Sequence, residues 1–278
     1  MMMKTKETNC LLVRFKRFLI STFLKETKLI YFFFKENRKS FNWFDHSWSH
    51  TQPHILNSSS LKELMYYNFN FALEHGLKTD SFYSVSPHHS GIYPLYEDLY
   101  ESWKDIWLIK ASSTEGYPHL KPFYSRRGFI YKEIMVVPRS TCGIFTHTIY
   151  FNSYPNGLDR LKSMIYGGEI FKTLLYNQVI VFMTHMTNYA NDRLALFVFE
   201  NLFRFIAKWT HLEFVAMPPL KLAEKYFEVY PQDIEPLWTN MCSDKRHMSI
   251  WSLNQSQCKN LPKFIIIGPQ KTGKFLIN

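Results

Sequence analysis

The stretch that decides the fold is Gln178-Val179-Ile180-Val181-Phe182-Met183-Thr184-His185. Its continuous β-branched and apolar run is typical of a buried strand, and it ends on a histidine. A second run of this kind is Ile134-Met135-Val136-Val137-Pro138-Arg139, which a proline ends. Over residues 84–90 we expect a short strand that runs into a loop, and over residues 106–112 a further strand.

Helical patterns lie between these strands. Apolar residues recur at helical spacing over residues 61–75, 96–107, 161–176, 192–209 and 220–230, and Gly76 stops the first of these segments. Because strands and helices alternate along the chain, the predicted fold class is α/β with parallel strands. In α/β barrels the active residues stand at the carboxyl ends of strands, and His185 occupies such a position.

A histidine motif precedes the first predicted helix. It reads His46-Ser47-Trp48-Ser49-His50, and His54 follows four residues later. Residues at i and i+4 share one face of a helix, so the imidazoles of His46 and His50 are expected to lie close enough to bind one metal ion. Imidazole is a common ligand of zinc, and a catalytic zinc site keeps one position open for water. The alternative is a polar, aromatic-rich helix start without a metal.

The composition is that of a packed globular protein with one large domain or two small ones. The 278 residues are 46% hydrophobic and 18% aromatic and include only 10 glycines, which excludes a disordered or collagen-like chain. The formal net charge of +10 indicates an anionic partner, either nucleic acid, an anionic membrane surface or an acidic polysaccharide. Nucleic acid ranks last, because no RNP, zinc-finger or helix-turn-helix signature is present.

The N-terminal segment and the cysteines leave several alternatives open. Residues 1–37 alternate basic residues with short apolar runs, and no run reaches the roughly 18 to 20 residues of a membrane span. A targeting segment, an interfacial helix and a misassigned start all fit this pattern. Cys10, Cys142, Cys242 and Cys258 show no CxxC spacing, which argues against a cysteine-rich zinc site. Cys242 and Cys258 fit a disulfide and two free thiols equally well.

The chain changes character at its C-terminal end. A buried strand, Phe264-Ile265-Ile266-Ile267, runs into the loop Gly268-Pro269-Gln270-Lys271-Thr272-Gly273. Such a strand and loop are typical of phosphate binding by backbone N–H groups and a lysine. The spacing is not that of a Walker A motif, and the chain ends at Asn278, so we expect no complete nucleotide site.

Short motifs spread over roughly residues 38–273 closely resemble those of the heparan sulfate N-deacetylase/N-sulfotransferases. They are Phe41-Asn42-Trp43-Phe44, His46-Ser47-Trp48-Ser49-His50, Gln52-Pro53-His54, Pro87-His88-His89-Ser90-Gly91, Ser113-Thr114-Glu115, Tyr117-Pro118-His119-Leu120-Lys121-Pro122, Arg126-Arg127-Gly128-Phe129-Ile130, Thr141-Cys142-Gly143, Phe145-Thr146-His147-Thr148, Phe182-Met183-Thr184-His185, Asn191-Asp192-Arg193-Leu194 and Gly268-Pro269-Gln270-Lys271-Thr272-Gly273.

This resemblance implies a bifunctional type II membrane enzyme of the Golgi. One domain of such an enzyme removes acetyl from N-acetylglucosamine in the heparan sulfate precursor, and a second transfers sulfate to the freed amine from 3′-phosphoadenylyl sulfate. The deacetylase domain resembles the polysaccharide deacetylases, which have a distorted (β/α) barrel and a divalent metal, with zinc expected here. Association with other enzymes of heparan biosynthesis follows from the same resemblance, and nucleic acid is not expected as a partner.

The resemblance also implies roles for individual residues. His46 and His50 match the two metal ligands of an H-[ST]-x-x-H motif, and His185 matches the general acid. The sulfotransferase loop is matched by Lys271, Thr272 and Gly273, which would contact the sulfate donor. The precursor is anionic, so basic and imidazole side chains are expected to bind it, namely Arg126, Arg127, Arg139, His88 and His89.

The chain departs from the family pattern at both ends. No aspartate precedes Asp45, so the family's upstream aspartate pair, a base and a third ligand, is unmatched. We therefore expect a partial sequence: residues 1–37 unmatched, 38–217 the later part of a deacetylase domain, 218–262 a connection and 263–278 the start of a sulfotransferase domain that does not bind the donor. The predicted function is heparan N-deacetylation with weak metal binding and little turnover, and the alternative is an inactive fragment that binds polysaccharide or a partner.

Overall fold

The computed structural model describes residues 36–40, 42–79, 81–93, 95–115, 127–140, 143–144 and 150–234. The chain divides into two units, residues 1–234 and residues 235–278, and every described residue belongs to the first unit. The predicted connection beyond residue 234 and the predicted sulfotransferase start at 263–278 lie outside the described residues.

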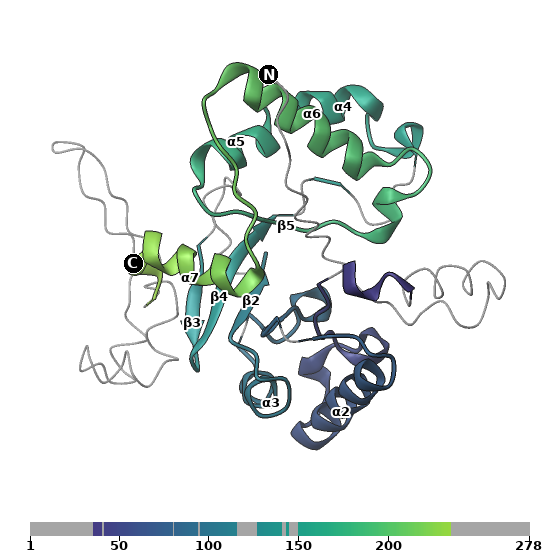
Figure 1. The fold of residues 1–278 in the computed structure, drawn as a ribbon, viewed down its shortest axis with the longest axis vertical. Coiled ribbons are helices and arrows are strands. Elements are labelled where there is room, and N and C mark those ends of the chain that lie inside the picture. The colour runs from purple at the N-terminus through teal and green to yellow at the C-terminus, as the bar shows by residue number, and fades with distance from the viewer. Residues whose placement is uncertain are drawn as a thin grey trace, which may run out of the picture. The chain divides into compact units, whose positions relative to one another are not determined.

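The described residues form a mixed α/β fold around an open, mostly parallel sheet (Figure 1). Its strands are β1 (Tyr83–Ser84), β2 (Ala111–Thr114), β3 (Phe129–Tyr131), β4 (Ile134–Ser140) and β5 (Val181–Phe182). Strands β1, β2 and β4 are parallel neighbours, β5 pairs in parallel with the last residues of β4, and β3 pairs antiparallel with its first residues. Asp45 adds one parallel bridge to Ser84. The α/β class predicted from the sequence is confirmed.

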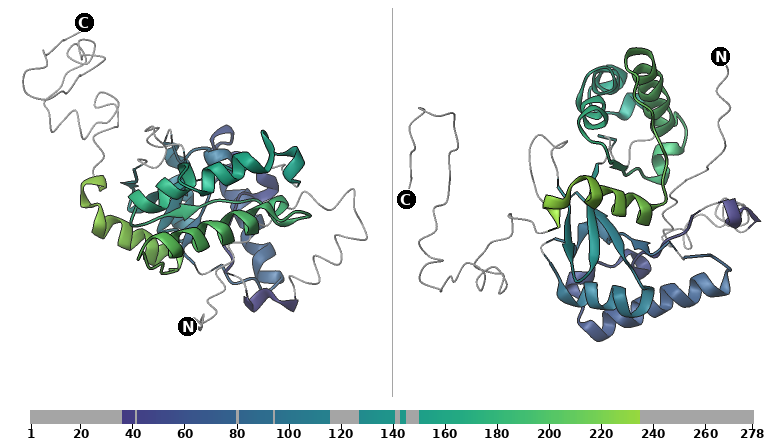
Figure 2. Two further views of the ribbon diagram at one scale, coloured as in Figure 1. Left: turned by 90° about the horizontal axis from the view of Figure 1, so that it is seen from above. Right: turned by 60° about the vertical axis from the view of Figure 1, so that its left-hand side comes forward.

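Helices cover both faces of this sheet (Figure 2). They are α2 (Ser58–Glu74), α3 (Glu97–Trp107), α4 (Gly157–Ile165), α5 (Glu169–Tyr176), α6 (Leu194–Trp209) and α7 (Pro219–Val229). Alternate residues of β4 point to opposite faces, as the two-residue period of a strand requires. Ile134 and Val136 pack with α2 and α3, whereas Val137 packs with α7. Helices α4, α5 and α6 share a third apolar cluster beside β5 (Figure 1).

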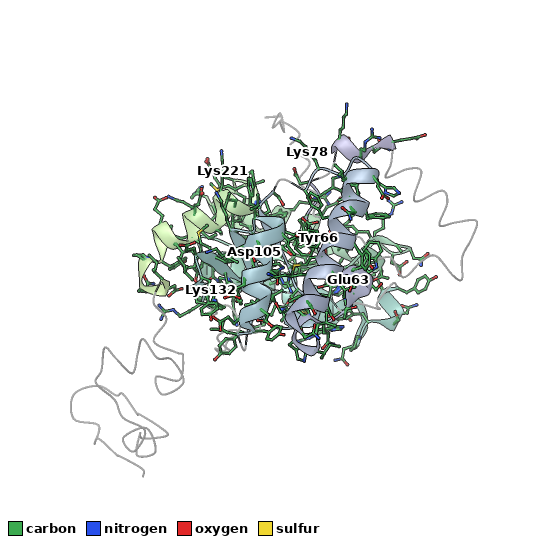
Figure 3. All side chains as sticks on the ribbon, turned by 90° about the horizontal axis from the view of Figure 1, so that it is seen from below. Glu63, Tyr66, Lys78, Asp105, Lys132 and Lys221 are labelled. Carbon is green, nitrogen blue, oxygen red and sulfur yellow. The ribbon has the colours of Figure 1, made fainter. Side chains whose placement is uncertain are left out.

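Local sequence signals account for several helix ends. The side chain of Asn57 accepts a hydrogen bond from the backbone N–H of Ser60 at 2.9 Å and so caps α2. Helix α3 ends where Leu108 adopts a left-handed conformation, and Pro219 occupies the first turn of α7. The outer side of α2 carries Glu63 and Tyr66, which point away from the sheet (Figure 3).

The structure corrects the predicted bounds of several helices and strands. The helix expected over 161–176 is two helices, because the chain turns at Gly167, where φ is +92°. The strand expected over 178–185 is reduced to Val181–Phe182, whose side chains are only half-buried. The strand expected over 106–112 begins at Ala111, because α3 continues to Trp107. No helix within the described ranges combines the length and the apolar character that a membrane span requires.

Candidate functional site

Most of the predicted site residues that the structure describes lie where the parallel strands end, an edge that we call the carboxyl edge of the sheet. His46 follows the bridge at Asp45, His88 and His89 follow β1, Arg139 lies at the end of β4 and His185 follows β5. Because parallel strands all point the same way, side chains that follow them meet at one edge. Segments far apart in the sequence therefore converge here.

His46 is buried, and a backbone carbonyl orients its ring. Its Nδ1 lies 2.5 Å from the carbonyl oxygen of Val85, the residue that follows β1. A carbonyl oxygen can only accept, so Nδ1 carries the proton and Nε2 keeps the lone pair. A histidine that ligates a metal typically has this arrangement, because the hydrogen bond at one nitrogen orients the other toward the ion.

His50 lies close to His46, but not because the two share a helix. The ring centroids are 5.2 Å apart at 63°. The expected helix over His46–His50 is wrong: Asp45 is still in the extended bridge, and the segment Trp48–His50 is a single 3-10 turn with left-handed φ angles at Ser49 and His50. The side chains meet through this turn, which closes with a hydrogen bond from the Thr51 N–H to the Trp48 carbonyl at 3.1 Å.

A third imidazole reaches this pair from another loop. The ring of His88 lies edge-on to the ring of His50, with centroids 5.0 Å apart. His88 and His89 both have left-handed φ angles, 52° and 60°, within the 3-10 turn Pro87–His89. Left-handed non-glycine residues cost about 1 kcal/mol or more each, and such strain concentrates at functional sites.

The donor set fits a metal ion in part. His46 and His50 supply two ring nitrogens on adjacent loops, yet within the described residues no group of three or more His, Cys, Asp or Glu side chains is arranged to hold a metal. Asp45 is the nearest carboxyl in sequence. It is buried, and desolvation raises its pKa to about 6 despite hydrogen bonds to Asn68, at 2.9 Å, and Thr79.

His89 belongs to a separate polar cluster, which we call the His89 network and which comprises His89, Thr114, Glu115 and Arg139. Arg139 is buried, and its Nη2 lies 3.1 Å from His89 Nδ1. The backbone N–H of Glu115 and the hydroxyl of Thr114 each lie 3.3 Å from the same nitrogen. Glu115 approaches His89 Nε2 at 3.6 Å and Arg139 Nε at 3.4 Å. Sequence reasoning quoted Glu115 within a motif but assigned it no role.

His185 follows β5 and begins the 3-10 turn Met186–Tyr189. Its backbone N–H donates to the side chain of Asn188 at 2.9 Å, and the Asn188 N–H donates to the His185 carbonyl at 2.9 Å. Asn188 is fully buried, so it anchors the histidine. Sequence reasoning missed Asn188, although an amide residue three positions after a turn start is a capping signal. A small cavity of about 60 Å³ is bordered by Phe44, two residues before His46, and by Thr184, next to His185, so the two segments lie near each other.

Arg127 contacts a carboxylate of the protein itself. Its Nε donates to Asp233 Oδ1 at 2.7 Å, and its Nη2 makes a second contact with the same oxygen. Asp233 is buried and also accepts from the Tyr226 hydroxyl at 2.5 Å, and that hydroxyl accepts from the Gly128 N–H at 2.8 Å. Burial and the Asp233 carboxylate raise the pKa of Tyr226. Substrate binding by Arg127 and Arg139 stays a prediction.

Arg126 and the donor-binding Lys271, Thr272 and Gly273 lie outside the described residues, as do all four cysteines.

Comparison with known proteins gives a consistent result. The family model described as heparan sulfate-N-deacetylase, deacetylase domain, matches residues 31–171. The human bifunctional heparan sulfate N-deacetylase/N-sulfotransferase 2 is 55% identical over 244 residues, which are 87% of this chain and 28% of the relative. The mouse enzyme 3 is 57% identical over 234 residues, 84% of this chain and 27% of the relative. The Drosophila melanogaster enzyme is 52% identical over 242 residues, which are 87% of this chain and 23% of the relative.

The chain thus spans 23% to 28% of the length of these relatives. The family model covers just over half of the 278 residues. The chain therefore belongs to the heparan sulfate N-deacetylase/N-sulfotransferase family, through its deacetylase domain.

Proposed function

We propose that this chain supplies two metal ligands and the general acid of an N-deacetylase site that acts on N-acetylglucosamine residues of a heparan sulfate precursor. The observation that carries the proposal is the His46–His50 pair at the carboxyl edge of the sheet, with the tautomer of His46 set by the carbonyl of Val85. The names of the relatives supply the substrate class and the reaction.

The roles of the residues follow from their chemistry. His46 and His50 would hold a divalent ion, zinc by preference, which when bound supplies polarisation of the acetyl carbonyl and a more acidic water. His185 acts as the general acid: its imidazolium donates a proton to the amine nitrogen as the amide C–N bond breaks. Asn188 supports this role by holding the His185 backbone.

Substrate contacts form a further part of the proposal. The precursor carries carboxylates, which suits arginine and histidine side chains near the site. Among the described residues, His88 is a candidate for contact with substrate, because its ring contacts the ring of His50. Arg126 joins it as a candidate from outside the described residues.

The remaining parts of the domain scheme rest on the family. We propose that the open sheet is the later part of a distorted (β/α) barrel, that residues 38–217 belong to the deacetylase domain, and that a sulfotransferase domain starts at 263–278 after a connection. Localisation to the lumenal side of the Golgi membrane is proposed on the same ground, and so is association with other enzymes of heparan biosynthesis.

The test is acetate release from N-acetylheparosan by the purified chain, with zinc added and then chelated. Zinc-dependent release that is lost in His185→Ala and kept in His211→Ala would support the complete proposal. His211 is a suitable control because it is exposed and follows α6. Zinc binding that depends on His46 and His50, without acetate release, would mean that the ligands are present and the catalytic base is not. Absence of both from a folded sample would refute the proposal.

The second candidate is a catalytically inactive module that binds polysaccharide or a partner. The observation that favours it is that the described residues contain no group of three metal-binding side chains. Salt-dependent binding of N-acetylheparosan, unaffected by chelation and unaccompanied by acetate release, would identify this function.

A further inference from the structure

We infer that the His89 network is a positioning device for the histidine pair, acting through His88, and that Glu115 and Arg139 are positioning residues rather than contacts for substrate. This inference rests on the proposed function for its biological meaning. The network joins three parallel strands at their carboxyl ends, because His89 follows β1, Glu115 follows β2 and Arg139 lies in β4.

The network sets the tautomer of His89. The Arg139 guanidinium and the Glu115 backbone N–H can only donate, and both point at Nδ1, at 3.1 Å and 3.3 Å. Nδ1 is therefore the acceptor, and the neutral ring carries its proton at Nε2. That N–H faces the Glu115 carboxylate, 3.6 Å from Oε2. The ring of His89 is thus oriented from both sides, by N–H donors at Nδ1 and by the Glu115 carboxylate at Nε2.

The burial of Arg139 favours a positioning role over direct contact with substrate. The residue is 6% exposed, and its guanidinium contacts Glu115 and His89 within the protein. The Glu115 side chain is 15% exposed. A buried charge is retained only when it is paired, so removal of the Glu115 charge would leave Arg139 without the carboxylate at 3.4 Å.

The network also maintains the conformation of His88, the residue that precedes His89. His88 and His89 are consecutive left-handed residues, a conformation that surrounding contacts must maintain. The ring of His89 is held by the network, and the turn is closed by the Ser90 N–H, which donates to the Pro87 carbonyl at 2.9 Å. With the turn maintained, His88 projects onto the ring of His50 at 5.0 Å. A path of direct contacts therefore links Glu115 to His50.

The experiment compares Glu115→Gln and Arg139→Lys with a matched control in the full chain. Glutamine at position 115 keeps an oxygen that can accept from His89 Nε2 but removes the negative charge. Lysine at position 139 keeps the positive charge but lacks the planar guanidinium with its fixed set of N–H donors. The control is Glu101→Gln, which removes the charge of an exposed carboxylate 2.5 Å from Lys132. Two readouts are taken: the zinc dissociation constant, by competition with a chromophoric chelator, and histidine ring 1H–15N spectra of the metal-free chain.

We expect Glu115→Gln and Arg139→Lys to weaken zinc binding by about 10- to 100-fold, the range typical of residues that orient a ligand. We also expect them to shift the ring signals of His88 and His50, whereas Glu101→Gln changes neither readout. Folded variants with the zinc affinity and both ring signals of the unsubstituted chain would overturn the inference. If the unsubstituted chain binds no zinc, the metal part of the proposed function fails, and the ring spectra alone decide this inference: shifted His50 and His88 signals support it and unchanged signals overturn it.

Discussion

The ring of His88 lies edge-on to the ring of His50, with centroids 5.0 Å apart, although helix α2 separates the two residues in the sequence. The loop after β1 and the turn before α2 are thereby joined at the histidine site. His54 strengthens this junction, because its Nδ1 contacts the Ser90 hydroxyl. The two loops act as one unit, and the following predictions concern this unit and its supports.

Replacement of His88 should weaken zinc binding less than replacement of a ligand. We expect His46→Ala and His50→Ala to abolish measurable binding, because only two ring nitrogens are proposed as ligands. His88→Ala should weaken binding by about 10-fold, because it removes the ring that orients His50. Calorimetric titration with zinc measures all three, with His211→Ala as the exposed control. Equal losses in His88→Ala and His50→Ala would instead make His88 a ligand.

Asp45 should make stability depend on pH. Burial raises its pKa from the ordinary 3.8 to about 6, so between these values the folded chain binds more protons at this carboxyl than the unfolded chain. The contribution of Asp45 to the free energy of unfolding is therefore fully present below about pH 4 and is lost as the pH rises through 6. The pKa difference limits this contribution to about 3 kcal/mol. Urea unfolding from pH 4 to 7 should show this decline, and Asp45→Asn should reduce it.

The control for Asp45 is Asp105→Asn. Asp105 is exposed on α3, where it pairs with Lys62 at 3.1 Å (Figure 3). A surface pair of this kind contributes at most about 1 kcal/mol, so Asp105→Asn should keep the pH profile of the unsubstituted chain. An Asp45→Asn chain with an unaltered profile would show that this carboxyl is not the source of the pH dependence.

The Arg127–Asp233 pair should stabilise the attachment of α7 to the sheet. Asp233 is buried and lies just after α7, while Arg127 lies just before β3. Asp233→Asn keeps the shape of the side chain but removes the charge beside the guanidinium, and it should lower the free energy of unfolding by about 2 kcal/mol. Because the Arg127 side chain is 30% exposed, water offsets part of the full cost of a broken buried pair.

Urea unfolding measures this loss against Glu228→Gln, which removes an exposed carboxylate 2.6 Å from Lys225 on α7. The control should change stability by less than about 0.5 kcal/mol. If the two variants lose the same stability, the Arg127–Asp233 pair is energetically equivalent to a surface pair.

Asn188 should matter for both stability and the geometry of His185. Asn188→Ala removes the acceptor of the His185 N–H and should lower the free energy of unfolding by about 1 to 2 kcal/mol, the range for a lost capping residue. It should also broaden or shift the His185 ring signal in 1H–15N spectra. Asn201→Ala is the control, because Asn201 donates to the Phe197 carbonyl of its own helix at 2.7 Å and accepts from the Tyr166 hydroxyl at 3.5 Å, and neither bond involves the His185 turn. If the His185 ring signal of Asn188→Ala is unchanged, Asn188 does not anchor His185.

The helices and the central strand could be predicted from the sequence, since each has a local pattern. Helices α2, α3, α6 and α7 begin and end within a few residues of the predicted bounds, and β4 matches its apolar run. Predictions failed where tertiary context overrides the local pattern. The apolar run that ends at His185 is typical of a long strand, but only Val181 and Phe182 pair with β4, whereas Val179 and Ile180 pack in clusters with helices.

The sequence alone determined the family and the α/β class and predicted the residues of the proposed site, because motifs and hydrophobic periodicity are local properties of a chain. Only the tertiary structure decided how those residues meet. His46 and His50 approach through a left-handed turn rather than a helix, His88 joins them from the loop after β1, and Arg139 turns inward to Glu115 and His89. These contacts arise because parallel strands bring distant segments to one edge of the sheet, and spacing within a single segment does not encode that convergence.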